Sequence, residues 1–230
     1  MKKLIIADKK LPEQAKKNLK QFGSLIEFST QSITYEAISG HPDIFTCQLP
    51  DKIILAPNTP FEYLEIFENA KINFEKGQQI VGMEYPQTAI YNAVVTENYF
   101  IFKKDIPDKK IIQNLSSQKS ILVKQGYCRC NLLSLKNDSF ITSDKNIYKN
   151  LSQEKLNVLY VDPKQIILPG FKHGFFGGTA GIIGNDVLIS GSLKYCSDKE
   201  KIQNFLTNLN YSIIELYDGP LFDGGSILCF

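Results

Sequence analysis

A chain of 230 residues with 43% apolar content can bury a substantial core, so a folded globular protein of one large domain or two small ones is expected. Its 26 basic and 24 acidic side chains are mixed along the sequence and give a net charge of +2. This balance argues against nucleic acid or a membrane surface as the main partner.

The N-terminus and the cysteines bear on the cellular compartment. The lysines near the start precede an apolar run that is too short for a signal-peptide core or a membrane span. Five cysteines are an odd number and too sparse for a disulfide framework. We therefore expect a cytoplasmic protein with free thiols.

In chain order, the first predicted elements are a strand at 4–8, a helix at 12–22 and a strand at 24–28. Four longer units follow, each with a strand, a turn, a second strand, a helix and a closing strand. Their first strands are predicted at 43–49, 89–95, 127–135 and 178–183, their second strands at 52–56, 99–102, 139–142 and 187–190, and their closing strands at 72–74, 120–123, 157–161 and 212–216. Capping residues place the helix starts at Thr59, Asp108, Asp144 and Ser197.

The chain ends with an opening strand at 224–229 and begins with the elements that this last unit lacks. The turns of the five units fall near residues 2, 51, 98, 138 and 186. A linear solenoid would cap its ends, whereas a unit shared between both ends favours a closed ring. We predict an α/β fold, a closed propeller of five strand-strand-helix-strand repeats in a single domain over residues 1–230. An ordinary α/β domain with chance regularity is the alternative.

This arrangement resembles the pentein fold, also called the guanidino-group modifying enzyme fold. That superfamily includes arginine and agmatine deiminases, dimethylarginine hydrolases and amidinotransferases, together with a non-catalytic ribosome-binding branch. The segment Gly224–Cys229 is similar to the Gly-Gly-Asn-Ile-His-Cys segment that carries the nucleophile in agmatine deiminases. The resemblance covers the whole chain as architecture and implies cysteine chemistry on a small nitrogenous substrate.

Residue by residue, the resemblance places Cys229 on the nucleophile and His173 within about a residue of the proton-shuttling histidine. A thiolate suits this chemistry because it is a strong, polarisable nucleophile. His41 and Asp43 lie where the first repeat of the family usually carries a substrate-binding aspartate. In a fivefold ring, all four side chains are expected to surround one central cavity.

Two departures from the family pattern weaken the case for arginine or agmatine as substrate. Phe175 stands where an aspartate commonly follows the histidine, and Lys124-Gln125-Gly126 stands where a Glu-Gly-Gly segment supplies a carboxylate. A cationic substrate without these carboxylates would be poorly compensated. The chain therefore resembles a branch of the superfamily that lacks some of the deiminase carboxylates.

The other cysteines suggest less. Cys128 and Cys130, on a predicted strand, would share one face, and we favour a buried position for one or both; a role in the cavity stays open. Cys47 and Cys196 are interpreted as core or surface thiols. Histidines, Asp43 and Cys229 could bind zinc, but no compact spacing motif supports it, so neither a metal nor another cofactor is expected.

Two functions follow from these observations. The first is cysteine-dependent hydrolysis, or amidino transfer, on a small guanidino, amidino or amide-type substrate, with Cys229 as nucleophile, His173 as acid-base and His41 with Asp43 as substrate-binding groups. The alternative is a non-catalytic pentein-fold binding protein. Either way, the expected partner is a small molecule in the central cavity, and the sequence leaves a homo-oligomer open.

Overall fold

The computed structural model describes residues 3–230, in which five three-stranded sheets share one internal order. In each sheet the first strand pairs antiparallel with the second, and the second pairs parallel with the third. In chain order of their second strands, the sheets are β17 (Leu228–Cys229), β1 (Leu4–Asp8) and β2 (Ser24–Phe28); β3 (Thr46–Gln48), β4 (Ile53–Leu55) and β5 (Phe74–Lys76); β6 (Val94–Val95), β7 (Tyr99–Lys103) and β8 (Lys119–Val123); β9 (Leu132–Leu135), β10 (Ser139–Thr142) and β11 (Asn157–Tyr160); and β13 (Ala180–Ile183), β14 (Asp186–Ile189) and β15 (Ser212–Glu215).

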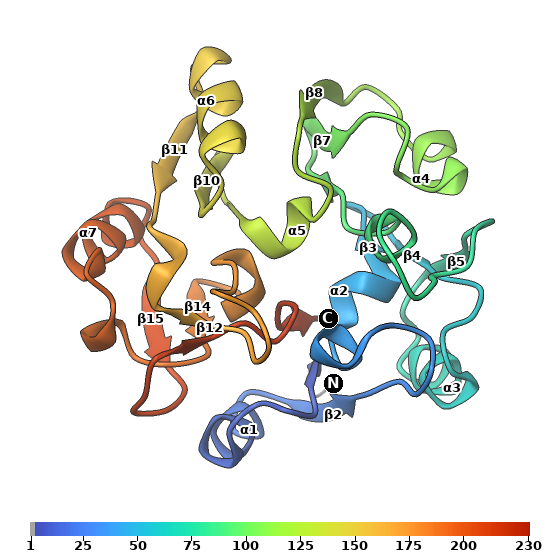
Figure 1. Ribbon diagram of the computed structural model, residues 1–230, viewed down its shortest axis with the longest axis horizontal. Coiled ribbons are helices and arrows are strands. Elements are labelled where there is room, and N and C mark those ends of the chain that lie inside the picture. The colour runs from blue at the N-terminus through green and yellow to red at the C-terminus, as the bar shows by residue number, and fades with distance from the viewer. Residues whose placement is uncertain (1–2) are drawn as a thin grey trace.

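One helix connects the second and third strands of every sheet, and Figure 1 shows these helices around the outside of the molecule. They are α1 (Glu13–Leu19), α3 (Phe61–Asn69), α4 (Lys109–Gln113), α6 (Lys145–Gln153) and α7 (Lys199–Asn208). The short helices α2 (Pro42–Phe45) and α5 (Cys128–Asn131) lie nearer the middle (Figure 1). A parallel pair of short strands, β12 (Ile166–Ile167) and β16 (Leu221–Phe222), lies outside the repeated pattern. Within residues 3–230, no helix is both long and apolar enough to cross a membrane.

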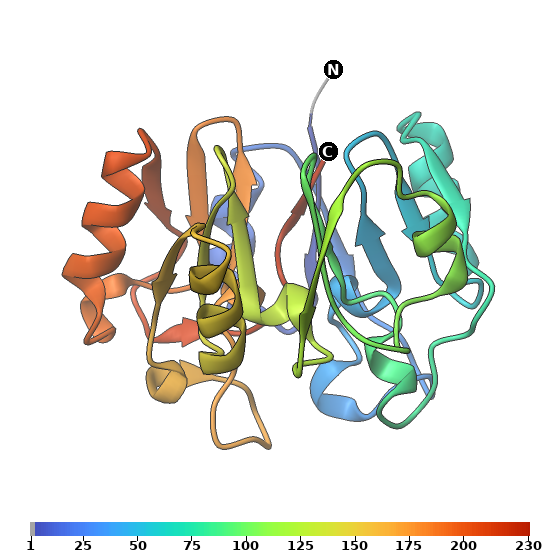
Figure 2. The same cartoon turned by 90° about the horizontal axis from the view of Figure 1, so that it is seen from above.

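Both ends of the chain contribute to one sheet. Cys229 pairs with Ile5 and Leu228 with Ile6, and the backbone of Leu4 exchanges hydrogen bonds of 2.9 and 3.0 Å with that of Phe230. Figure 2 shows the red C-terminal strand beside the dark blue N-terminal strand at the middle of the molecule. The split unit that the sequence predicts is therefore joined as expected. The turn predicted near residue 2 lies outside the described residues.

The predicted first strands begin too early. Short helical turns occupy their first residues: α2, α5 and the 3-10 turns η2 (Gln87–Ala89) and η4 (Gly177–Thr179). A short apolar run does not distinguish a strand from a buried helical turn, which is why the prediction was wrong here. Cys128 and Cys130 accordingly lie on a helical turn, not on one face of a strand.

Two predicted helix caps are also wrong. The Thr59 hydroxyl donates to the carbonyl of Ala56 at 2.8 Å, and α3 begins after Pro60 without a side-chain cap. Helix α7 begins after Asp198 rather than Ser197. Asp108 and Asp144 do cap their helices; Asp144 Oδ1 accepts from the backbone N–H groups of Asn146 and Ile147.

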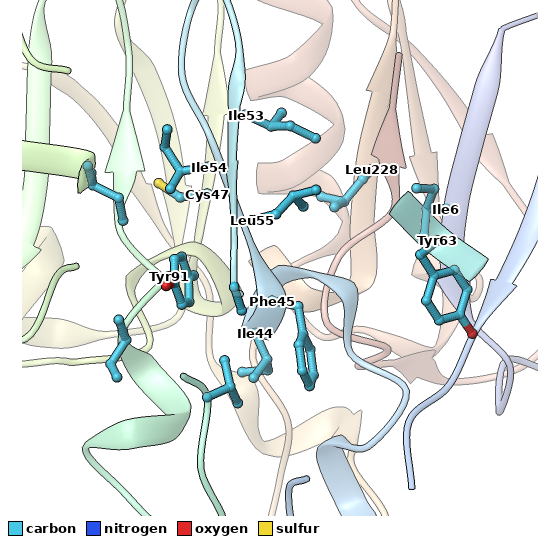
Figure 3. Packing of buried hydrophobic residues seen from close by; sticks show 14 of the residues in the cluster. Ile6, Ile44, Phe45, Cys47, Ile53, Ile54, Leu55, Tyr63, Tyr91 and Leu228 are labelled. Carbon is cyan, nitrogen blue, oxygen red and sulfur yellow. The ribbon is translucent and has the colours of Figure 1, made fainter. Parts of the chain in front are cut away.

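The largest apolar cluster packs the second sheet against the sheet made by the chain ends. Ile54 and Leu55 of β4 are fully buried, and they share this cluster with Ile6, Tyr91 and Leu228 (Figure 3). Each outer helix turns its apolar side inward, as Ile202 and Leu206 do in α7. The consequence is a core built around the first and second strands.

Candidate functional site

The first strands of all five sheets line one small central cavity. Its volume is about 190 Å³. The lining residues are Thr46, Gln48, Ala93, Val94, Val95, Leu133, Ser134, Ile182, Ile227 and Cys229 from the first strands and their edges, and Arg129 from α5. The cavity thus combines an apolar wall with a thiol, a guanidinium and a few neutral polar groups.

Cys229 is half-buried and faces this cavity. Burial raises the pKa of its thiol to about 12, while the charges of Arg129 and Lys3 act in the opposite direction. Desolvation outweighs these cations because a thiolate loses more solvation than two nearby cations restore. The resting thiol is therefore protonated at neutral pH.

A second group of polar side chains lies buried beside α2 and α5. Asp43, in the first turn of α2, accepts a 2.7 Å hydrogen bond from Ser226 Oγ and a 3.1 Å hydrogen bond from Cys130 Sγ on the same oxygen, Oδ2. His41 Nε2 lies 3.8 Å from Asp8 Oδ2, at the end of β1. We refer to Asp8, His41, Asp43, Cys130, Asp223 and Ser226 as the buried polar cluster.

Several polar atoms of this cluster have no hydrogen-bond partner. They are Asp8 Oδ2, both ring nitrogens of His41 and Asp43 Oδ1, and the exposed fractions of these three residues are 1%, 1% and 0%. Leaving buried polar atoms unpaired costs free energy, and proteins seldom retain such atoms without a use for them. The cluster is therefore the strongest structural indication of a site.

The protonation states follow from burial. Desolvation lowers the pKa of His41 to about 4, so its ring is neutral at pH 7. Desolvation also raises the pKa of Asp8 to about 6 and that of Asp223 to about 7, although backbone N–H groups donate to both carboxylates. The pKa of Cys130 lies well above its usual value, again through burial and the nearby carboxylates.

Arg129 connects the cavity with the buried polar cluster. Its charge interacts with Asp43 and Cys130 on one side and with Cys229 on the other. Its Nη1 donates to the carbonyl of Gly177 at 3.3 Å. One cation therefore balances a buried carboxylate and also faces the thiol in the cavity.

His173 contacts its own segment of the chain. It is half-buried in the segment before η4, where its Nδ1 lies 3.0 Å from the carbonyl oxygen of Gly174 and its ring packs edge-on against Phe175. It does not line the central cavity in the described chain. The structure thus brings His41 and Asp43 together and places Cys229 in the cavity, but leaves His173 on neighbouring backbone.

Sequence reasoning missed several members of this centre. Asp8 and Asp223 supply carboxylates next to Asp43, although the sequence pattern suggested that two carboxylates were missing. Asp8 is the last residue of β1 and Asp223 directly follows β16, so a carboxylate at the end of a short strand was the available signal. Arg129 was not singled out, and the turn of α5 that directs it into the cavity could not be distinguished from a strand.

Solved structures show which class of fold this is. The chain is similar to a dimethylarginine dimethylaminohydrolase from Pseudomonas aeruginosa, with 11% identity, a TM-score of 0.56, and coverage of 94% of this chain and 92% of that one. It is also similar to the C. jejuni agmatine deiminase, with 13% identity, a TM-score of 0.54, and coverage of 92% and 74%. An amidinotransferase from Microseira wollei gives 10% identity, a TM-score of 0.55, and coverage of 93% and 88%. The fold is that of the pentein, or guanidino-group modifying enzyme, superfamily, as the sequence resemblance predicted.

The chain belongs to a family of unknown function (DUF6873), whose sequence profile matches residues 6–228. No curated protein matches the chain. The structural neighbours share guanidino-group chemistry by their names. In this protein a cysteine, Cys229, lies in the wall of the central cavity.

Proposed function

We propose that the protein is a closed, pentein-like α/β propeller of five repeats in a single domain, and that it hydrolyses a small nitrogenous substrate with Cys229 as nucleophile. The observation that carries this proposal is the central cavity, which takes lining residues from all five sheets and has the Cys229 thiol and the Arg129 guanidinium in its wall. A volume of about 190 Å³ suits only a small molecule.

The charges around the cavity bear on the substrate class. Arg129 would repel the cationic head of a guanidino or amidino substrate, whereas it would stabilise negative charge on an amide carbonyl oxygen as the thiolate attacks. Asp43 interacts with Arg129, and together with the nearby Asp8 and Asp223 it would supply carboxylates for a cationic end. An amide-type substrate with a cationic end fits this arrangement better than a free guanidinium.

The proposed reaction needs a base because the resting thiol is protonated. His173 would take the Cys229 proton as the Sγ–C bond forms and return it to the leaving nitrogen as the C–N bond breaks; water would then cleave the thioester and regenerate the thiol. His41 and Asp43 would orient the substrate. Asp43 would act through its carboxylate, together with the charge of Arg129. Delivery of this proton requires the segment that carries His173 to approach the cavity.

The test is a screen of guanidines, amidines and amides, with release of ammonia or amine as the readout. Reactions are quenched in acid, and the peptide that contains Cys229 is examined by mass spectrometry for a covalent acyl or amidino adduct. We expect turnover and an adduct on Cys229, loss of both in Cys229→Ser, and retention of both in Cys128→Ser. Turnover that survives in Cys229→Ser, or an adduct on another cysteine, would refute the assignment.

The second candidate is a non-catalytic binding protein. Two observations favour this function: the Cys229 thiol is protonated, and His173 is not among the described residues that line its cavity. Substrate-like compounds that bind, that are not turned over, and whose affinity falls in Arg129→Met would support it over hydrolysis.

A further inference from the structure

The buried polar cluster contains three different types of metal-binding side chain at close range. One ligand atom each from His41, Asp43 and Cys130 can be chosen so that all three lie within 4.8 Å of one another. These residues come from two repeats and are all buried, so the fold, and not a local spacing motif, brings them together. From these contacts we propose that His41, Asp43 and Cys130 bind a divalent transition metal, with Zn²⁺ as the preferred ion. Asp8 lies outside this group, with its Oδ2 3.8 Å from His41 Nε2, and would move closer to become the fourth ligand.

The unpaired atoms are the ones that a metal would use. A neutral imidazole offers a nitrogen lone pair, and both ring nitrogens of His41 are without a hydrogen-bond partner. Asp43 Oδ1 and Asp8 Oδ2 are likewise unpaired, while the second oxygen of each carboxylate already accepts a hydrogen bond. A single ion would satisfy three of these buried groups at once.

The distances suit a small tetrahedral site. Zinc binds sulfur at about 2.3 Å and nitrogen or oxygen at about 2.0–2.2 Å, so neighbouring ligand atoms lie roughly 3.3–3.8 Å apart. His41 Nε2 and Asp8 Oδ2 are 3.8 Å apart, at the upper end of this range. Cys130 Sγ lies 3.1 Å from Asp43 Oδ2, the oxygen beside the proposed ligand Oδ1. In the second pair a hydrogen bond now occupies the gap, and metal binding would replace the thiol proton and release it to solvent.

Partners outside the ligand set already orient the ligands. Asn92 Nδ2 donates to Cys130 Sγ at 3.3 Å, Ser226 Oγ donates to Asp43 Oδ2 at 2.7 Å, and the backbone N–H of Lys10 donates to Asp8 Oδ1 at 2.7 Å. Such outer hydrogen bonds are a regular feature of protein metal sites. With zinc bound, two carboxylates, one thiolate and the nearby Arg129 would give a charge sum of zero.

The ligand types select the ion. Thiolate and imidazole favour zinc and related transition metals, whereas Mg²⁺ and Ca²⁺ prefer sites made of oxygen ligands. Asp8 also lines a cavity of about 320 Å³ together with Lys10, Glu36 and Asp223, and this cavity offers a route to the buried ligands. This inference is independent of the role proposed for Cys229, but a metal on His41, Asp43 and Asp8 would replace the substrate contacts proposed for these residues.

The test uses the full chain, stripped with a chelator and titrated with Zn²⁺ and with Co²⁺. We expect one metal per chain by elemental analysis, and a near-ultraviolet thiolate-to-cobalt absorption band. Cys130→Ser should abolish this band, while Cys128→Ser, on the same helical turn, should leave it unchanged. Asn92→Ala should weaken affinity roughly 10- to 100-fold, as loss of an outer hydrogen bond does at known sites.

A folded wild-type protein that binds neither ion, or a cobalt band that survives in Cys130→Ser, would overturn the metal site. If Cys130→Ser does not fold, His41→Gln takes its place. Its metal binding is then compared with that of the wild-type protein, followed through the cobalt band. The readout is metal binding and not turnover, so its failure would leave the proposed hydrolase function standing, and the reverse also holds.

Discussion

The pairing of the two chain ends can be tested through Leu228. This side chain is 1% exposed and packs in the largest apolar cluster, and it is the register partner of Ile6 across β1 and β17. Leu228→Ala removes three buried carbon atoms, worth about 2.4 kcal/mol at about 0.8 kcal/mol each. The cavity left behind adds to this cost, so we expect a loss of about 3–4 kcal/mol in the free energy of unfolding.

The assay is urea unfolding of single and double variants. Leu122→Ala on β8, at a half-exposed position, is the control and should cost less than about 0.5 kcal/mol. Combining Leu228→Ala with Ile6→Ala should give a coupling energy of at least about 0.5 kcal/mol, because contacting residues do not contribute additively. Strict additivity, or a Leu228→Ala cost no larger than that of Leu122→Ala, would refute the joined sheet.

Three further predictions rest on local geometry. Burial raises the pKa of Cys229 to about 12, so its alkylation rate in the resting protein should rise about tenfold per pH unit from pH 7 to pH 9. The rate is measured by mass spectrometry across this pH range, and a plateau below pH 8 would contradict the prediction. Gly225 and Gly184 both have positive φ, but an added Cβ meets a side chain at 2.2 Å only at Gly225. Gly225→Ala should therefore lower the melting temperature far more than Gly184→Ala. Equal shifts in melting temperature would be inconsistent with this packing. Asp144→Ala should cost about 1 kcal/mol in chemical unfolding, whereas Ser197→Ala should cost under about 0.5 kcal/mol, and the reverse order would show that the caps are misassigned.

The second strands, and all third strands but one, were predicted closely because their signals are local; the exception is the strand predicted at 72–74, which lies at 74–76. The strands at 4–8 and 24–28 have the predicted bounds, and the second strands at 52–56 and 139–142 are shifted by no more than one residue at each end. Alternating or continuous apolar runs between turn residues determine these elements, and the order of elements determines which strands can pair.

The candidate site was predicted only in part, because its members meet through the fold. His41 and Asp43 are near neighbours in sequence, and they do lie together in the buried polar cluster. Cys130, Asp8 and Asp223 join them from segments far away in the chain, and no local spacing announces such a meeting. The predicted partnership of His173 with Cys229 remains a prediction for the covalent-adduct experiment.

The sequence by itself determined the kinds and order of the elements, the split unit and the resemblance to the pentein fold, since each depends on patterns within short stretches of chain. Only the tertiary structure decided that the first strands start with helical turns, and that these turns direct Arg129 into the cavity and Cys130 toward Asp43. The physical reason is that a buried turn and a buried strand have the same apolar composition. Whether a helical turn or a strand forms depends on the polar atoms that meet at the centre once all five sheets are in place.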